Sequence, residues 1–170
     1  EIQIRLVGSE MCIRDGYKTS NNRFARQWEV LPAGSPNPGT IHHYGVEMFT
    51  QDFNGYKWVP FYAMVGGGIP MDEVPVALQR RADEYQVLRT HIEVTKPGKH
   101  MMRLQGKLSQ MNLFLEKEKI ELPPNGGEVD FLVDCKTTGK QEILLVFHGA
   151  DSTEFSLEAL SEDLRMNKTF

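Results

Sequence analysis

The chain has 170 residues, a net charge of −4 at pH 7 from 19 basic and 23 acidic side chains, and 40% hydrophobic residues. This length is typical of one globular domain. A mildly acidic balance of mixed signs argues against the basic surface on which nucleic-acid binding depends. No apolar run approaches the ~18 residues that a membrane-spanning helix needs. The composition therefore predicts a single domain whose partners include neither nucleic acid nor a membrane.

Residues 1–15 are set apart by the stretch LVGSEMCIRD at positions 6–15. Its codons can be written so that they resemble the adapter of transposase-based sequencing libraries, read in frame. Its charged residues also leave no apolar core for a signal peptide. We therefore expect residues 1–15 to be a sequencing-adapter artefact and the chain to be a fragment of a longer protein. The rest of the chain then keeps a single cysteine, Cys135, which excludes an internal disulfide and a cysteine-rich metal site.

Residues 16–40 are polar and rich in turn-forming residues, with three prolines and two glycines in residues 32–39. Before these prolines, Phe24, Trp28 and Val30 are apolar enough to dock, either as the tail of a preceding domain or as a strap across the following one. The predicted domain organisation is a linker or tail over 16–40, a β-sandwich domain over 41–162 and a tail over 163–170.

From about Tyr44 onward the sequence favours short strands separated by turns. Asn54-Gly55 is a strong hairpin-turn pair, and Gly66-Gly67-Gly68 is a second break. Residues 76–84 have helical propensity but follow Pro75, so their structure stays ambiguous. Six strand-like segments follow in the second half: Tyr85–Thr95, His100–Gly106, Met111–Ile120, Glu128–Cys135, Gln141–His148 and Glu154–Leu160.

In two of these segments the pattern of apolar residues predicts where the strand lies in a sheet. In residues 128–135 every second side chain, from Val129 to Cys135, is apolar, which predicts one buried face. Residues 143–147 are apolar on both faces, which suits a central strand. Regular short strands with turn signals favour an all-β fold, an antiparallel, jelly-roll-like β-sandwich with an N-terminal linker.

The second half resembles the β-sandwich domain first seen in the anthrax protective antigen and shared by bacterial glycosidases and fungal flocculin adhesins. His91–Leu104 (HIEVTKPGKHMMRL) matches that family's strand, Pro-Gly turn and second strand, and Asn112–Ile120 (NLFLEKEKI) matches the segment that follows. Residues 139–147 and 154–160 resemble its late and closing strands. The resemblance covers about residues 39–160 and implies a sugar-binding or accessory module of an extracytoplasmic protein.

The chain departs from this family where members that bind calcium and sugar carry paired aspartates. Gly106-Lys107-Leu108-Ser109-Gln110 occupies that turn, and Glu116-Lys117 replaces the Asp-Gly of the next one. A hard cation needs several oxygen ligands, with carboxylates supplying charge. The resemblance therefore implies the fold, and no metal-binding residue is carried over.

The densest aromatic cluster is the main candidate for a binding surface. An aromatic ring flanked by short polar side chains is a surface that can hold a sugar, because the ring stacks and the polar groups bind hydroxyls. The alternative is that most of these rings are core, with Trp58 as the best candidate for an exposed one. The cluster comprises Tyr44, Phe49, Phe53, Tyr56, Trp58, Phe61 and Tyr62. The predicted ligand-binding residues are Asp52, Asn54, Tyr56 and Trp58.

No catalytic or metal-binding arrangement is expected. His42-His43 would point to opposite faces of a strand, and no GxSxG nucleophile motif is present. Cys135 ends an apolar strand, where a buried thiol is the commoner outcome. Gly66-Gly67-Gly68 lacks the spacing of a phosphate-binding loop. We therefore expect no catalytic residue, no metal, no cofactor and no enzymatic activity.

The function that the sequence favours is a non-catalytic carbohydrate-binding or accessory module in a larger extracytoplasmic bacterial protein, whether secreted, periplasmic or at the cell surface. Its expected partners are a polysaccharide or glycan and a neighbouring domain of the same parent chain. The alternative is a structural or adhesion interaction module without a small-molecule ligand.

Overall fold

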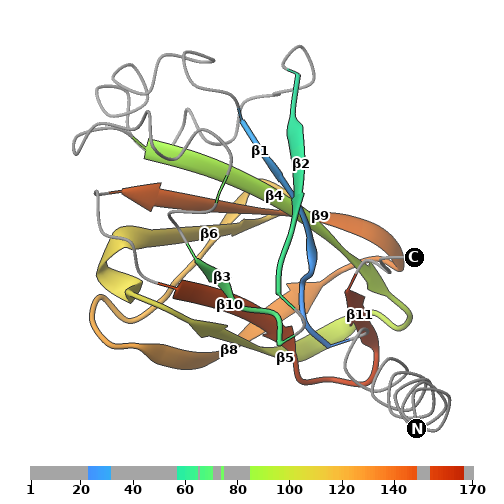
Figure 1. Ribbon diagram of the computed structural model, residues 1–170. Helices are drawn as coiled ribbons and strands as arrows, with labels where there is room; N and C mark the ends of the chain where they lie inside the picture. The colour runs from blue at the N-terminus through green and yellow to red at the C-terminus, as the bar shows by residue number, and fades with distance from the viewer. Residues whose placement is uncertain are drawn as a thin grey trace, which may run out of the picture.

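The computed structural model describes residues 23–31, 57–64, 66–70, 74, 85–148 and 154–166. Two antiparallel sheets face each other across one apolar core (Figure 1), which confirms the predicted β-sandwich. The strands are β1 (Gln27–Val30), β2 (Val59–Tyr62), β3 (Ile69–Pro70), β4 (Tyr85–Val94), β5 (Gly98–Gln105), β6 (Met111–Leu115), β7 (Glu118–Ile120), β8 (Glu128–Cys135), β9 (Gly139–His148), β10 (Glu154–Ala159) and β11 (Leu164–Met166). The expectations for residues 1–15 and 76–84 lie outside the described residues.

The larger sheet has the order β2-β1-β4-β9-β6-β7, with β11 beside the far end of β4. Its central strand is β9, as the sequence predicted. Ile143 and Leu145 point into the core between the sheets, whereas Leu144 and Val146 join a second buried cluster on the outer face. Because both faces of β9 are covered, its run of apolar residues carries no polar alternation.

The smaller sheet has the order β3-β10-β5-β8. In β8, Phe131, Val133 and Cys135 are buried while Leu132 between them is 55% exposed, which confirms the predicted alternation. Burial raises the pKa of the Cys135 thiol, and the negative charge of Asp134 adds to this effect. Cys135 is thus a protonated core side chain at neutral pH.

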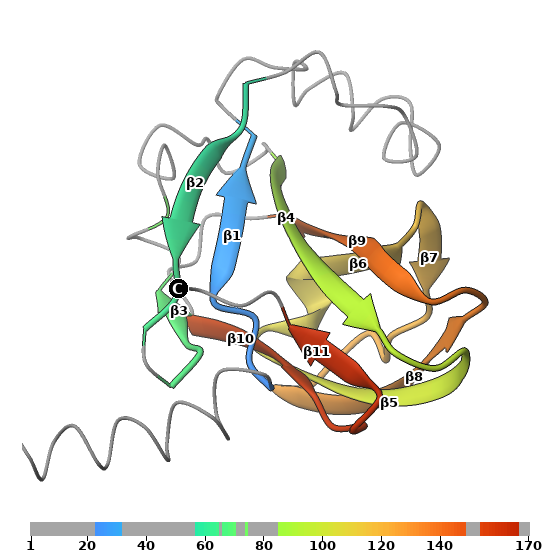
Figure 2. The same ribbon diagram turned by 90° about the vertical axis from the view of Figure 1, so that its right-hand side faces the viewer.

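One side of the sandwich is closed by chain segments that cross between the sheets. Residues 23–25 hydrogen-bond to β10 of the smaller sheet, through Ala25 N to Leu157 O at 2.9 Å and Ala159 N to Arg23 O at 2.7 Å. The same segment then continues as β1 between β2 and β4 of the larger sheet. Figure 2 shows β1 and β2 on this side and β7 on the opposite one.

The fully buried indole of Trp28 fixes this crossing segment. Its Nε1–H donates to the carbonyl of Ala25 at 2.8 Å, and its ring packs edge-on against Phe155 of the smaller sheet with centroids 5.5 Å apart. Phe155 in turn packs against Phe147 of β9, with centroids 4.9 Å apart. Three rings therefore join the two sheets through the core.

The structure corrects the predicted limits of the domain. Residues 16–40 were expected to be a linker or the tail of a preceding domain, and 163–170 a tail, but β1 and β11 lie within these ranges and both pair with β4. The prolines that follow β1 dominate the composition of that region and hide a short strand in which Trp28 and Val30 alternate with polar residues. The sandwich extends over at least residues 23–166.

The segment Met111–Ile120, expected as one strand, is a hairpin of β6 and β7. Its turn residues Glu116 and Lys117 have positive φ values of 47° and 71°, a conformation that usually selects Asn or Gly. Glu116 is held there by β9: its N–H donates to the carbonyl of Glu142 at 3.0 Å, and its carboxylate accepts from the Glu142 N–H. Tertiary hydrogen bonds thus replace the missing turn signal.

Of the three glycines that follow β2, Gly67 is required by its packing and Gly66 is not. A Cβ on Gly67, whose φ is +81°, would lie 2.5 Å from a ring carbon of Phe24. A Cβ on Gly66 would meet nothing within 4 Å.

We expect Gly67→Ala to lower the free energy of unfolding by about 2–4 kcal/mol, because it adds both left-handed strain and a steric clash. Gly66→Ala is the matched control and should change stability by less than ~0.5 kcal/mol. Urea unfolding of the two variants measures the difference. Equal stability of the two variants would contradict the packing of Phe24 on this turn.

Candidate functional site

The predicted ligand residues are only partly within the described chain. Asp52, Asn54 and Tyr56 lie outside it, whereas Trp58 directly precedes β2. The structure places Trp58 half-buried on the outer face of the larger sheet. It packs there against the second apolar cluster, formed by Leu31, Val87, Phe114, Leu144 and Val146.

Arg89 covers one face of the Trp58 ring. The guanidinium carbon lies 4.2 Å from the ring centroid, a cation–π contact. Arg89 Nη2 lies 2.6 Å from Glu29 Oε2, and its Nε donates to the same oxygen at 2.7 Å. Its Nη1 is 3.7 Å from Glu142 Oε2. A ring that the sequence predicted to be exposed is therefore largely engaged with its own protein.

Tyr62 is an exposed ring on this face. Its side chain is 63% exposed, and it lies on the outer side of β2 because Phe61 next to it points into the core. Tyr62 belongs to the aromatic cluster of the sequence but was not among the predicted ligand residues. The missed signal was the alternation of β2, which becomes readable once buried Phe61 fixes its inward side.

Three polar side chains continue from Tyr62 across neighbouring strands. Gln27 is directly opposite Tyr62, and His91 is directly opposite Glu142. Gln27 precedes Glu29, which pairs with Arg89, by two residues, and its carbonyl accepts a hydrogen bond from the Thr90 hydroxyl at 2.8 Å. Gln27 therefore lies beside β4, near the residue that precedes His91. We call Tyr62, Gln27, His91 and Glu142 the platform row.

The platform row combines a stacking surface with both hydrogen-bond donors and acceptors. The amide of Gln27 supplies both, and Glu142 supplies a carboxylate. The pKa of His91 is lowered to about 4, mainly by burial and then by the positive charges of Lys140 and Arg89, against the opposing charge of Glu29. His91 is therefore a neutral imidazole at pH 7, with one donor and one acceptor nitrogen.

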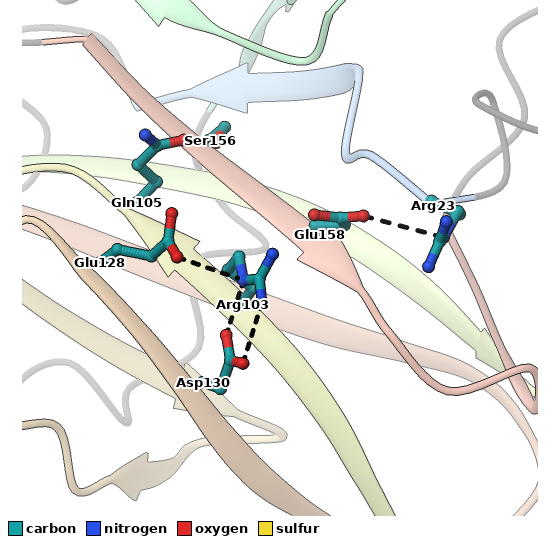
Figure 3. A network of polar contacts seen from close by, with 7 residues as sticks. All are labelled: Arg23, Arg103, Gln105, Glu128, Asp130, Ser156 and Glu158. Carbon is teal, nitrogen blue, oxygen red and sulfur yellow. Dashed lines mark hydrogen bonds and ion pairs between the residues drawn. The ribbon is translucent and has the colours of Figure 1, made fainter.

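The outer face of the smaller sheet has a different character (Figure 3), because ion pairs cover it. Arg103 contacts Asp130 through two hydrogen bonds of 2.7 and 3.0 Å, and its Nε lies 3.6 Å from Glu128. Hydrogen bonding to Arg103 holds the pKa of the Asp130 carboxyl below its usual range. Arg23 lies 3.7 Å from Glu158 farther along the face. These contacts link strands across a solvent-exposed surface.

Several hollows lie at the margins of the sandwich, among them two beside strands of the smaller sheet. A cleft of about 380 Å³ opens between the edge strands β7 and β8, where Lys136 Nζ lies 3.3 Å from Glu118 Oε1. A hollow of about 600 Å³ lies beside Gln105 and Ser156, at the end of the smaller sheet. The one ring in their walls, Phe155, is 1% exposed, so neither offers a stacking surface.

Two kinds of feature are absent from the described residues. No three His, Cys, Asp or Glu side chains of this part of the chain are grouped so that they could hold a metal ion. Nor does it contain a helix with the length and apolar character needed to cross a membrane.

Comparison with known proteins gives similarity in structure and none in sequence. No protein-family model and no curated protein matches the chain. A family 35 carbohydrate-binding module from an environmental isolate matches with a TM-score of 0.40 and 12% identity, over 52% of this chain and 74% of that one. The β-glucuronidase of Ruminococcus gnavus matches with a TM-score of 0.48 and 9% identity, over 81% of this chain and 28% of the enzyme.

A β-glucosidase from Kluyveromyces marxianus also matches, with a TM-score of 0.47 and 8% identity, over 84% of this chain and 19% of the enzyme. The chain therefore spans well under two thirds of either enzyme. β-Sandwiches of unrelated function share this level of likeness, so the function is inferred below from the chain's own residues.

The electrostatic environment of His91 can be measured directly. We expect its pKa, about 4 in the native protein, to rise in Lys140→Gln, because Lys140 is the leading charge that lowers it. Lys136→Gln is the matched control and should leave this pKa unchanged, since Lys136 is not among the charges that shift the pKa of His91. An NMR titration of the imidazole resonances reports both. A pKa that stays at about 4 in Lys140→Gln would contradict the arrangement of charges on this face.

The same shift makes stability depend on pH. The folded-state pKa of His91 lies below the ordinary value of 6.5, so the unfolded chain binds a proton that the folded chain does not between pH 6.5 and about 4. Its contribution to stability is complete above this window and is lost as the pH falls through it. We expect His91→Gln to lose less stability than the native protein across this window, as measured by urea unfolding. Equal losses would contradict the burial of His91.

Proposed function

We propose that this protein is a non-catalytic carbohydrate-binding or accessory β-sandwich module that holds a glycan on the outer face of its larger sheet. The observation that carries the proposal is the exposed ring of Tyr62 beside the polar groups of Gln27 and His91. A sugar ring presents an apolar face of C–H groups and a rim of hydroxyls. An aromatic ring beside neutral donors and acceptors complements both.

The surroundings of the platform row support a fixed binding surface. Arg89 is held between Trp58, Glu29 and Glu142, and these contacts span four neighbouring elements of the sheet. The apolar cluster beneath them is buried, with Phe114 and Val146 both at 0% exposure. Side chains that are already ordered lose little conformational entropy when a ligand binds.

The setting that we propose is an extracytoplasmic one, in which the module is part of a larger bacterial protein and also contacts a neighbouring domain. The resemblance of residues 39–160 to the protective-antigen family is what supports this setting. Secretion, periplasmic location and attachment to the cell surface are all compatible with it.

One observation favours the rival proposal, a structural or adhesion module without a small ligand. Leu132 is 55% exposed on the smaller sheet, directly opposite half-buried Met101 and beside the ion pair of Arg103 and Asp130. An apolar centre with a polar rim is the usual anatomy of a protein interface.

Truncation of the exposed ring tests the glycan proposal. We expect Tyr62→Ala to weaken retention on the bound polysaccharide about tenfold or more, which corresponds to the loss of ~1.4 kcal/mol of stacking. Tyr62→Phe keeps the ring and should retain most of the binding. Affinity electrophoresis of the full chain through gels that contain different polysaccharides measures the effect.

Leu132→Ala removes an exposed apolar side chain from the other sheet and serves as the matched control. Its retention should equal that of the native protein. If no polysaccharide retards the native chain, the glycan proposal fails and the rival proposal, a protein interface at Leu132, is favoured.

A further inference from the structure

A second row of side chains lies beside the platform row, on the same face of the larger sheet. Glu93 of β4 is directly opposite Arg165 of β11 on one side and Lys140 of β9 on the other. Glu93 follows His91 by two residues and so points to the same face. All three side chains of this second row, Arg165, Glu93 and Lys140, are exposed.

The second row lies within reach of a ligand on the platform row. Two residues along a strand span about 6.6 Å, roughly the width of one pyranose ring. β1 and β11 both pair with the same edge of β4, so Arg165 continues the column in which Gln27 lies. A glycan that extends from Tyr62 over Gln27 towards His91 would therefore also approach Arg165.

The cations of the second row differ from the other arginines described above. Arg89 and Arg103 have their guanidinium groups tied to carboxylates at 2.6–3.0 Å. Within the described residues, no side-chain hydrogen bond or ion pair involves Arg165 or Lys140. Two cations flank one carboxylate, Glu93, so the second row carries a net charge of +1 on a chain whose total charge is −4.

The charges of the neighbouring groups agree with this geometry. Glu29, and Glu142 directly opposite His91, are both engaged by Arg89. Among the charges that act on His91, those of Lys140 and Arg89 outweigh that of Glu29. At His91 itself, positive charge therefore exceeds negative charge.

We infer that this face is selective for acidic glycans, and that it binds a carboxylate-bearing sugar with its ring on Tyr62 and its carboxylate on Arg165. This inference rests on the proposed function and adds the substrate class. The planar guanidinium matches a carboxylate with two parallel N–H···O bonds. Lys140 adds a second positive charge on the other side of Glu93, and His91 and Gln27 bind the hydroxyls.

Paired ligands isolate the role of the carboxylate. Oligogalacturonate and glucuronate-bearing xylan fragments, each as the free acid and as the methyl ester, are titrated into the full chain by calorimetry. The esters keep the sugar ring and remove the charge. We expect each bound fragment to bind at least about threefold more weakly as its ester, and the difference to shrink at high salt because the contact is exposed.

Variants of the second row should change affinity in opposite directions. Arg165→Gln should weaken binding of the free acid about threefold to tenfold and remove the preference over the ester. Glu93→Gln should strengthen binding of the free acid, because it removes a competing carboxylate. Lys99→Gln, an exposed cation of the smaller sheet, is the matched control and should have no effect. Opposite effects at neighbouring positions are not explained by a loss of folding.

The outcomes separate the inference from the proposed function. If the esters bind as tightly as the free acids, or if Arg165→Gln keeps the preference, the inference is wrong while glycan binding at Tyr62 stands. If neither form of any fragment binds but a neutral polysaccharide does, the inference also fails. If the native chain binds no glycan at all, both fail together.

Discussion

The packing of the Trp28 ring between the two sheets is the contact on which the rest of this structure depends. Its indole ring reaches Phe155 of the smaller sheet while its own strand, β1, pairs with β4 of the larger one. The chain can therefore cross between the sheets only in one register. That register places β2 against β1, which turns Tyr62 outward when Phe61 turns inward. A core tryptophan thus orients a surface ring that lies 34 residues away in the sequence.

The two outer faces of the sandwich are stabilised in different ways, and this difference is why we propose the glycan site on the larger sheet. On the smaller sheet, charged side chains pair across strands and remain in water, as Arg103 and Asp130 do. On the larger sheet, an apolar cluster covers β9 and carries Trp58 and Arg89 above it. An apolar base with a polar margin can hold a ring, whereas a layer of ion pairs must be desolvated before anything can pack on it.

The parts of this fold that the sequence predicted are those whose signal is local. In residues 128–135 buried and exposed side chains alternate, because one face of that strand is covered. In residues 143–147 the side chains are apolar without alternation, because both faces of that strand are covered. β1 escaped prediction because its four residues precede a proline-rich stretch. The turn at Glu116 and Lys117 was implied only by the family resemblance, because hydrogen bonds to β9 hold it in place of a Gly or Asn. Tyr62 was visible as an aromatic residue, but its outward direction depends on a register set by distant strands.

The second row shows most clearly what a sequence cannot reveal by spacing. Arg165 and Lys140 lie 72 and 47 residues from Glu93, and only the pairing of three strands places them side by side. The same pairing decides which guanidinium groups are engaged within the protein. Arg89 lies opposite Glu29 and Arg103 opposite Asp130, so their charges are neutralised within the sheet. Arg165 is at the margin of its sheet and shares its one opposite carboxylate with a lysine. Strand register therefore separates Arg89 and Arg103, which stabilise the fold, from Arg165, whose guanidinium group can still bind a carboxylate.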